Sequence, residues 1–243
     1  MASIVAGGIV ATVGILAIGV LISAQPFLQP SKGPSVLLAF SIVSDENMPS
    51  WCDDVSKILN DDKIDAVVFF SGEIAEEYPD CVASFNDHID IGSSTYHHNR
   101  LTEFDDYSDQ LEQVSEGKLA VDRTGKLDSK SFKAPYGDTD ENIYSLLNKT
   151  GVLADFSYAD RYHKVHDGQF IWFDIRVVDL ANSDREKLDE LDTDEGTPIQ
   201  INIDNSISPE DVTTLIAELQ GKRVDFLSAS ELTGIPLTIR SKA

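Results

Sequence analysis

Two adjacent histidines, His97 and His98, stand in a polar loop that follows an extended segment. An apolar run at 66–70, a helical stretch at 73–85 and a second extended run at 88–91 precede this loop. In parallel α/β folds, loops at the carboxyl ends of strands carry the binding and catalytic residues. The loop around His98 is therefore the first candidate for a site.

A single imidazole does not make a metal centre, because zinc normally takes three or four protein ligands. A second histidine pair, His163 and His166, lies in a polar stretch without helical pattern, and we expect a solvated loop there. A remodelled metal site could combine these histidines or His98 with Asp45 or Asp160. The simpler expectation is that His98 is a hydrogen-bonded loop residue.

Apolar runs and helical periodicities alternate along most of the chain. The predicted strands cover 36–40, 66–70, 88–91, 131–136, 152–158, 170–178, 199–203 and 224–227. The predicted helices cover 50–60, 73–85, 105–116, 138–149 and 209–219, with a loop-rich stretch at 118–126 and an acidic helix or loop at 184–194. Strands that alternate with helices predict a parallel sheet or a complete or irregular β/α barrel with right-handed crossovers.

The N-terminus has a different character from the rest of the chain. Residues 2–30 carry no charge, and the first charged side chain is Lys32. About 20 apolar residues suffice to span a bilayer as a helix. We expect a transmembrane anchor at 1–25, a linker at 26–35 and one domain at 36–243. A cleaved signal peptide is the alternative, although it normally begins with basic residues.

The charge balance excludes some classes of partner. Forty-two acidic residues against 19 basic ones give a formal net charge of -23. Nucleic-acid binding needs clustered lysine and arginine, so we expect no nucleic-acid partner. The membrane contact is expected through the N-terminal helix alone, and the acidic residues are expected to form a solvated surface.

Cys52 and Cys81 are the only cysteines, and their spacing fits neither a zinc nor a redox motif. A disulfide between them would indicate an oxidising exterior, whereas two buried free thiols are equally compatible with the sequence. Asn148 begins an Asn-Lys-Thr triplet and is a glycosylation candidate. We expect a single-pass membrane protein with its domain outside the cytoplasm.

Four segments together resemble the polysaccharide deacetylase family, also called the NodB homology domain. They are Phe69–Glu73 followed by Pro79, Asp90–Thr102, Phe132–Gly137 and Val224–Leu232, so that the resemblance covers about residues 35 to 232. The resemblance implies an irregular (β/α) barrel and metal-assisted removal of N-acetyl or O-acetyl groups from glycans. In that family an aspartate and two histidines bind the metal, a second aspartate is the general base, and a late histidine is the acid.

The chain departs from the family at most of these positions. Ser41 stands in the first-strand motif, where both aspartates are absent, and Ser94 replaces the first metal histidine. His98 matches the second metal histidine, and Lys133 replaces an arginine. The late leucine-histidine-aspartate stretch aligns with Ile203, Asp204 and Asn205.

The motif around Pro135 and Tyr136 is better retained, and in the family it lines the groove beside the acetyl group. The cleft candidates are thus Ser41, Ser94, His98, Lys133, Pro135, Tyr136 and Asp204. A structural turn at Pro135 is the alternative interpretation, because proline fixes the backbone there.

Three functions remain open from the sequence. The first is a catalytically degenerate family member that binds a surface glycan or a protein. The second is a divergent hydrolase of glycan N-acetyl or O-acetyl groups, and the third is a structural subunit of a membrane or envelope complex. No cofactor is expected, except a divalent, zinc-like metal if the hydrolase hypothesis holds.

Overall fold

The computed structural model describes residues 34–85, 88–158, 161–166, 169–180 and 197–241. Within those ranges no helix is both long and apolar enough to cross a membrane. The expected anchor at 1–25, most of the linker and the acidic segment at 184–194 lie outside the described residues.

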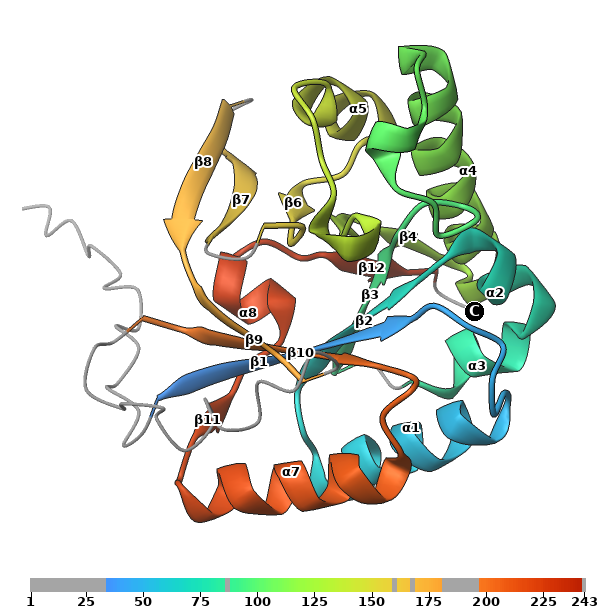
Figure 1. Ribbon diagram of the computed structural model, residues 1–243. Helices are drawn as coiled ribbons and strands as arrows, with labels where there is room; N and C mark the ends of the chain where they lie inside the picture. Colours follow the sequence, from blue (N-terminus) through green and yellow to red (C-terminus); the bar gives the residue numbers. More distant parts are fainter. Residues whose placement is uncertain (1–33, 86–87, 159–160, 167–168, 181–196, 242–243) are drawn as a thin grey trace, which may run out of the picture. The chain divides into compact units, whose positions relative to one another are not determined.

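Ten of the described strands form one sheet, which makes the domain an α/β fold with a barrel-like sheet (Figure 1). The strands follow the order β8-β7-β6-β5-β3-β2-β1-β10-β9, with β11 pairing at the end of β1. All pairings in this sheet are parallel except those of β7 with β6 and with β8. Its strands are β1 (Ser35–Ile42), β2 (Ala66–Phe70), β3 (Ile89–Ser93), β5 (Ser131–Phe132), β6 (Ala154–Asp155), β7 (Arg161–His166), β8 (Gln169–Asp174), β9 (Arg176–Asp179), β10 (Ile199–Asp204) and β11 (Asp225–Phe226). The other two described strands, β4 (Leu127–Ser129) and β12 (Thr238–Arg240), pair antiparallel in a separate two-stranded sheet.

Successive residues of β1 face opposite sides of the sheet, as the period of a strand requires. Leu37 and Ala39 pack inside the curved sheet with Phe69 and Phe156. The alternate residues, such as Phe40, pack outward against the covering helices. Both faces are apolar, which explains why the sequence of β1 reads as one continuous run.

The described helices, except α8 (Ala229–Thr233), pack on the outside of the sheet. Those on the outside are α1 (Ser50–Asp62), α2 (Gly72–Glu77), α3 (Pro79–Ser84), α4 (Tyr107–Gly125), α5 (Ile143–Thr150) and α7 (Pro209–Gly221). Figure 1 shows α1 and α7 along one side of β1 and β10, with α8 on the other side. Ala229 of α8 packs with Leu37 and Val67, so α8 fills the interior of the curved sheet.

Two helix predictions need correction. The stretch 118–126, expected to be rich in loops, continues α4 to Gly125. Lys118 is buried there and contacts Asp122 and Asp128, and these ion pairs replace the apolar contacts that the periodicity lacked. The helix predicted at 73–85 is divided into α2 and α3, because Pro79 begins a new helix.

The segment around His163 is also different from the prediction. It forms strand β7 rather than a solvated loop, and His163 is fully buried with its Nδ1 3.4 Å from Asp155 Oδ2. Burial raises the pKa of the Asp155 carboxyl and lowers the pKa of the His163 imidazole. The predicted strand at 170–178 is split into β8 and β9. These two strands stand at opposite ends of the sheet order, β8 beside β7 and β9 beside β10.

Cys52 on α1 and Cys81 on α3 are joined by a disulfide, with their Cα atoms 5.3 Å apart. The bond connects the helices that follow β1 and β2, and both sulfur atoms are buried. Asn148 is exposed in the last turn of α5.

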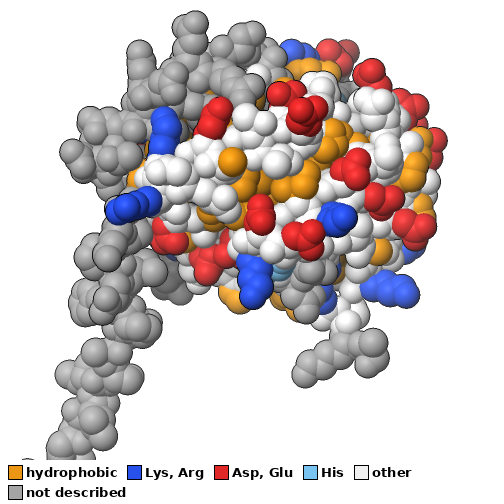
Figure 2. All heavy atoms as spheres, turned by 90° about the horizontal axis from the view of Figure 1, so that it is seen from below, with side chains coloured by type: hydrophobic (Ala, Val, Ile, Leu, Met, Phe, Trp, Pro, Cys, Tyr) orange, Lys and Arg blue, Asp and Glu red, His pale blue; other side chains and the backbone are white. Residues whose placement is uncertain are grey.

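Acidic side chains are scattered over the face of the domain seen in Figure 2, with a few lysines and arginines between them. Where that face is formed by described residues, basic side chains lie among acidic ones. This distribution agrees with the solvated acidic surface expected from the composition.

Candidate functional site

A cleft of about 860 Å³ opens at the carboxyl ends of the parallel strands. All seven cleft candidates from the sequence line it, namely Ser41, Ser94, His98, Lys133, Pro135, Tyr136 and Asp204. The structure therefore brings together residues that are up to 163 positions apart in the chain.

Strand periodicity explains how these side chains reach the cleft. Ser41 continues the inward-facing series of Leu37 and Ala39, so its hydroxyl lies where β1 leaves the apolar interior. Asp204 pairs in register with Ser41 at the same height on β10. Ser94 and Lys133 follow the last residues of β3 and β5, whose ends are hydrogen-bonded through Lys133 N and Ser93 O.

Lys133 and Ser41 are in direct contact across the mouth of the curved sheet. Lys133 Nζ donates a hydrogen bond of 2.9 Å to Ser41 Oγ. Burial lowers the pKa of Lys133 to about 8, because an ammonium group loses hydration there. The carboxylates of Asp179 and Asp204 oppose this shift without cancelling it.

The rim of the cleft carries backbone strain. His98 and Tyr136 have φ angles of 56° and 60°, in a region that residues with a side chain rarely adopt. Their rings lie 5.2 Å apart, and the Arg100 guanidinium lies 4.2 Å from the Tyr136 ring centre. Tyr136 is nevertheless 67% exposed, so this strain presents an aromatic face to solvent rather than burying it.

Two buried polar atoms of the cleft have no hydrogen-bond partner within the structure. They are Ser94 Oγ and His98 Nδ1, and Ser94 is only 4% exposed. Burial and the charge of Lys133 lower the pKa of His98 to about 4, so the imidazole is neutral at pH 7. Each atom therefore keeps unused hydrogen-bonding capacity in a residue that lines the cleft.

The donor set does not fit the metal of the resembled family. The equivalent positions hold one imidazole and two hydroxyls, and the ammonium of Lys133 would repel a cation. Among the described residues, no three His, Cys, Asp or Glu side chains gather in a metal-binding arrangement. Asp45 and Glu46 are exposed and outside the cleft lining, while Asp160 lies outside the described residues.

Several cleft residues were missed by sequence reasoning. They include Ser44, Arg100, Ser157, Tyr158, Asp179 and Asn202. Asn202 stands two residues before Asp204 on β10, so strand periodicity gave a usable signal for it. Asp179 had no such signal, because the sequence predicted one strand over 170–178 and gave no separate strand ending at Asp179.

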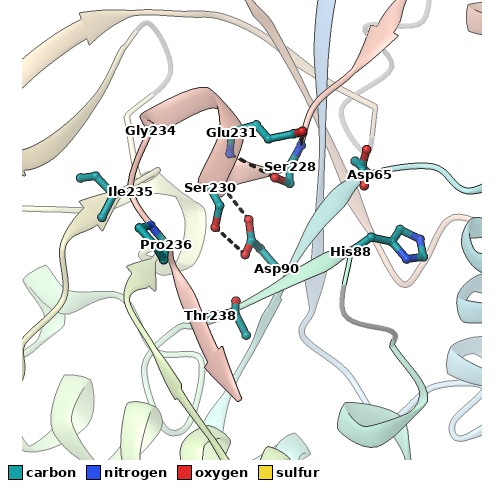
Figure 3. A pocket seen from close by; sticks show the side chains of 10 residues that line it. All are labelled: Asp65, His88, Asp90, Ser228, Ser230, Glu231, Gly234, Ile235, Pro236 and Thr238. Atoms are coloured by element: carbon teal, nitrogen blue, oxygen red, sulfur yellow. Dashed lines mark hydrogen bonds between the residues drawn. The ribbon is translucent and has the colours of Figure 1, made fainter. Parts of the chain in front are cut away.

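A second hollow, of about 520 Å³, lies at the amino ends of β2 and β3. Figure 3 shows Asp90 at its centre, with the carboxylate directed toward Ser230 of α8. Ser230 donates to Asp90 through its backbone N at 2.6 Å and its Oγ at 2.8 Å. Ser228 and Glu231 form a capping box at the start of the same helix. Burial raises the pKa of Asp90, which these hydrogen bonds partly offset.

The family model of polysaccharide deacetylases matches residues 29–154, just over half of the chain. This chain belongs to the polysaccharide deacetylase family. The matched region contains six of the seven cleft candidates, all except Asp204. No curated protein sequence matches the chain.

Solved structures of deacetylases share the fold of this family member. The peptidoglycan deacetylase PdaC from Bacillus subtilis aligns with a TM-score of 0.61 at 15% identity, over 84% of this chain and 92% of that one. A family 4 carbohydrate esterase from Streptomyces lividans, in complex with acetate, gives 0.59 at 17% identity, over 86% and 98%. A CE4 family pseudoenzyme from Bacillus anthracis gives 0.61 at 14% identity, over 83% and 66%.

Proposed function

We propose that this family member binds a cell-surface glycan in its retained cleft and does not use metal-assisted deacetylation. The observation that carries the proposal is the combination of an open cleft with the wrong donors for a metal. The cleft lies at the carboxyl ends of the strands and keeps the Pro135–Tyr136 motif, while an ammonium and two serine hydroxyls stand in place of the family's metal ligands.

The lining is suited to a sugar. Sugars stack their apolar faces on aromatic rings, and Tyr136 presents such a ring at the rim. Ser94 Oγ and His98 Nδ1 offer hydrogen-bonding capacity that the protein does not use. Strained backbone at His98 and Tyr136 is typical of residues held for ligand contact. A pseudoenzyme among the structural relatives supports the loss of the family's metal-assisted chemistry in this chain.

The apolar segment at 1–25 completes the proposal by holding the domain at a membrane surface. In this arrangement the domain faces the cell exterior, where a disulfide between Cys52 and Cys81 is stable.

The test uses the full-length protein, solubilised in mild detergent and purified without chelator. We expect retention on immobilised chitin oligosaccharides, peptidoglycan fragments or acetylated xylan, equal with and without EDTA. Zinc, cobalt and nickel should bind at far less than one equivalent per chain. Tyr136→Ala should weaken retention at least ~tenfold, whereas Leu119→Ala, which removes an exposed apolar side chain from α4, should leave it unchanged.

Two results would contradict the proposal. One bound metal per chain that is lost in His98→Ala would support the family's hydrolytic chemistry instead. Failure to retain any of these glycans, together with co-purification of a membrane complex, would support the structural-subunit hypothesis.

A further inference from the structure

The contact between Ser41 and Lys133 joins a nucleophile to a base. The two residues come from strands that are separated in the sheet by β3 and β2, and they meet only because both side chains point into the cleft. A serine hydroxyl is a weak nucleophile unless an adjacent base removes its proton, and a lysine amine serves as that base in some hydrolases.

The surroundings of Lys133 favour the neutral amine that a base requires. Burial lowers the pKa of Lys133 to about 8, close to the pH at which a general base is most effective. The other groups that face it are Asp179 and Asp204 at the ends of β9 and β10, and the neutral His98 in the loop after β3. The lysine that replaces the family's arginine can therefore lose its proton, which an arginine cannot do.

We propose that Ser41 and Lys133 form a metal-independent nucleophile–base pair that removes acyl groups from O-acylated sugars. This inference rests on the proposed binding of a glycan in the cleft. It adds an ester-cleaving step to a site whose metal chemistry is lost.

The reaction balances without any further reactant except water. Ser41 Oγ bonds to the ester carbonyl carbon as its proton passes to Lys133 Nζ. The carbon–oxygen bond to the sugar then breaks, and the sugar hydroxyl takes the proton from Lys133. Water attacks acyl-Ser41 in the same way, releases the carboxylic acid and restores both residues.

Esters fit this pair better than amides. The alcohol of an ester leaves with the single proton that Lys133 carries, whereas an amine is a much poorer leaving group. Ser94, whose buried hydroxyl has no partner among the described residues, lines the same cleft as Ser41.

The simpler explanation of the contact is that Ser41 Oγ only accepts a hydrogen bond from the half-buried ammonium of Lys133. The two interpretations differ in what happens when an activated ester is added. The full-length protein is mixed with 4-nitrophenyl acetate in the presence of EDTA, quenched, and analysed by mass spectrometry of peptides. Nitrophenol release is followed from pH 6 to pH 9.

We expect one acetyl group on Ser41, and a rate that rises with pH and levels off above about pH 8, the pKa of Lys133. Ser41→Ala and Lys133→Met should each lower the rate at least ~100-fold. Lys133→Arg keeps the charge and the hydrogen bond, and it should be equally inactive because arginine stays protonated. Ser115→Ala on α4 and Lys57→Met on α1 are the controls and should keep the wild-type rate.

The absence of acetyl-Ser41, or an unchanged rate in Ser41→Ala, would overturn the proposal. So would an active Lys133→Arg variant. Glycan retention by Ser41→Ala, measured in parallel, reports both folding and binding. Retention without acylation would overturn the nucleophile–base pair and leave the proposed glycan binding intact. Acylation without retention would overturn the glycan binding and leave the nucleophile–base pair intact.

Discussion

The two ends of the curved sheet both carry a polar hollow, but they differ in how far the buried polar groups are hydrogen-bonded. At the amino ends, Asp90 accepts two hydrogen bonds from Ser230, and Ser228 and Glu231 cap the same helix. At the carboxyl ends, Ser94 Oγ and His98 Nδ1 have no hydrogen-bond partner among the described residues.

Backbone strain follows the same division. His98 and Tyr136 have positive φ angles beside the cleft. Among the described residues that line the second hollow, positive φ occurs at Gly234, where the absence of a side chain makes it unstrained. Among the described residues that line the second hollow, His88 has an unpartnered atom, Nε2, on a ring that points away from Asp90 (Figure 3). The comparison teaches that depth and polarity do not distinguish the cleft from the second hollow, whereas the hydrogen bonding of the central polar groups and strain at residues with a side chain do.

The largest effect on stability is expected at the amino ends of the strands, where both carboxylate oxygens of Asp90 accept hydrogen bonds. Asp90→Ala removes a buried acceptor and leaves Ser230 N and Oγ without their partner, at a cost of about 2–3 kcal/mol in the free energy of unfolding. Asp90→Asn keeps one acceptor oxygen and should lose less. Urea denaturation measures both, with the exposed Asp53→Ala as control. A large loss of glycan retention in a folded Asp90→Ala protein would break the comparison.

Replacing Lys133 should stabilise the protein. Lys133→Met removes the cost of burying an ammonium, and we expect a gain of about 2 kcal/mol at pH 7. The pKa is about 8 in the folded state and 10.5 in the unfolded state, so the unfolded chain binds more protons between these values. The gain should therefore be full below pH 8 and vanish near pH 10.5. Equal stabilities of the two proteins at pH 7 would show that the ammonium is not penalised.

The rim tyrosine should affect binding more than stability. Tyr136→Ala is expected to weaken glycan retention at least tenfold, equivalent to about 1.4 kcal/mol. Tyr136→Gly should weaken it equally and raise the melting temperature, since glycine adopts a φ of 60° without strain. A lower melting temperature in Tyr136→Gly would mean that the tyrosine is kept for packing.

The smallest effects come from a matched pair of serines. Ser230→Ala loses the hydroxyl bond to Asp90, and we expect a destabilisation of about 1 kcal/mol. Ser94→Ala removes a buried hydroxyl that has no partner, so stability should be unchanged or slightly higher while glycan retention falls. Thermal unfolding of both variants decides this, and a similar loss in each would remove the distinction between the two ends.

Much of the fold was predictable because apolar runs dominate its centre. The sequence 66–70 has no polar residue, so its assignment as a strand did not depend on context. The second half of α4 was missed because Lys118 is held inside by Asp122 and Asp128, a contact that periodicity cannot anticipate. His163 was misplaced for a related reason, since its partner Asp155 comes from another strand.

The cleft residues also show what the sequence can predict and what it cannot. Ser94, His98 and Lys133, which the family motifs put at the ends of strands, line one cavity in the structure. No motif predicts that Lys133 Nζ contacts Ser41 Oγ, since that depends on the width of the sheet's mouth. Nor could the sequence predict the positive φ of Tyr136, because neither tyrosine nor its neighbours require it.

The central place of β1 has a consequence for synthesis of the chain. β1 emerges first among the described strands, pairs early with β2, and must wait for β10 on its other side. Residues joined at this seam, such as Val43 and Asn205, are 162 positions apart. Until β10 leaves the ribosome, an apolar strand edge remains open to any passing chain. Chaperone demand should therefore peak late in translation, and chains truncated before β10 should aggregate rather than persist as folded halves.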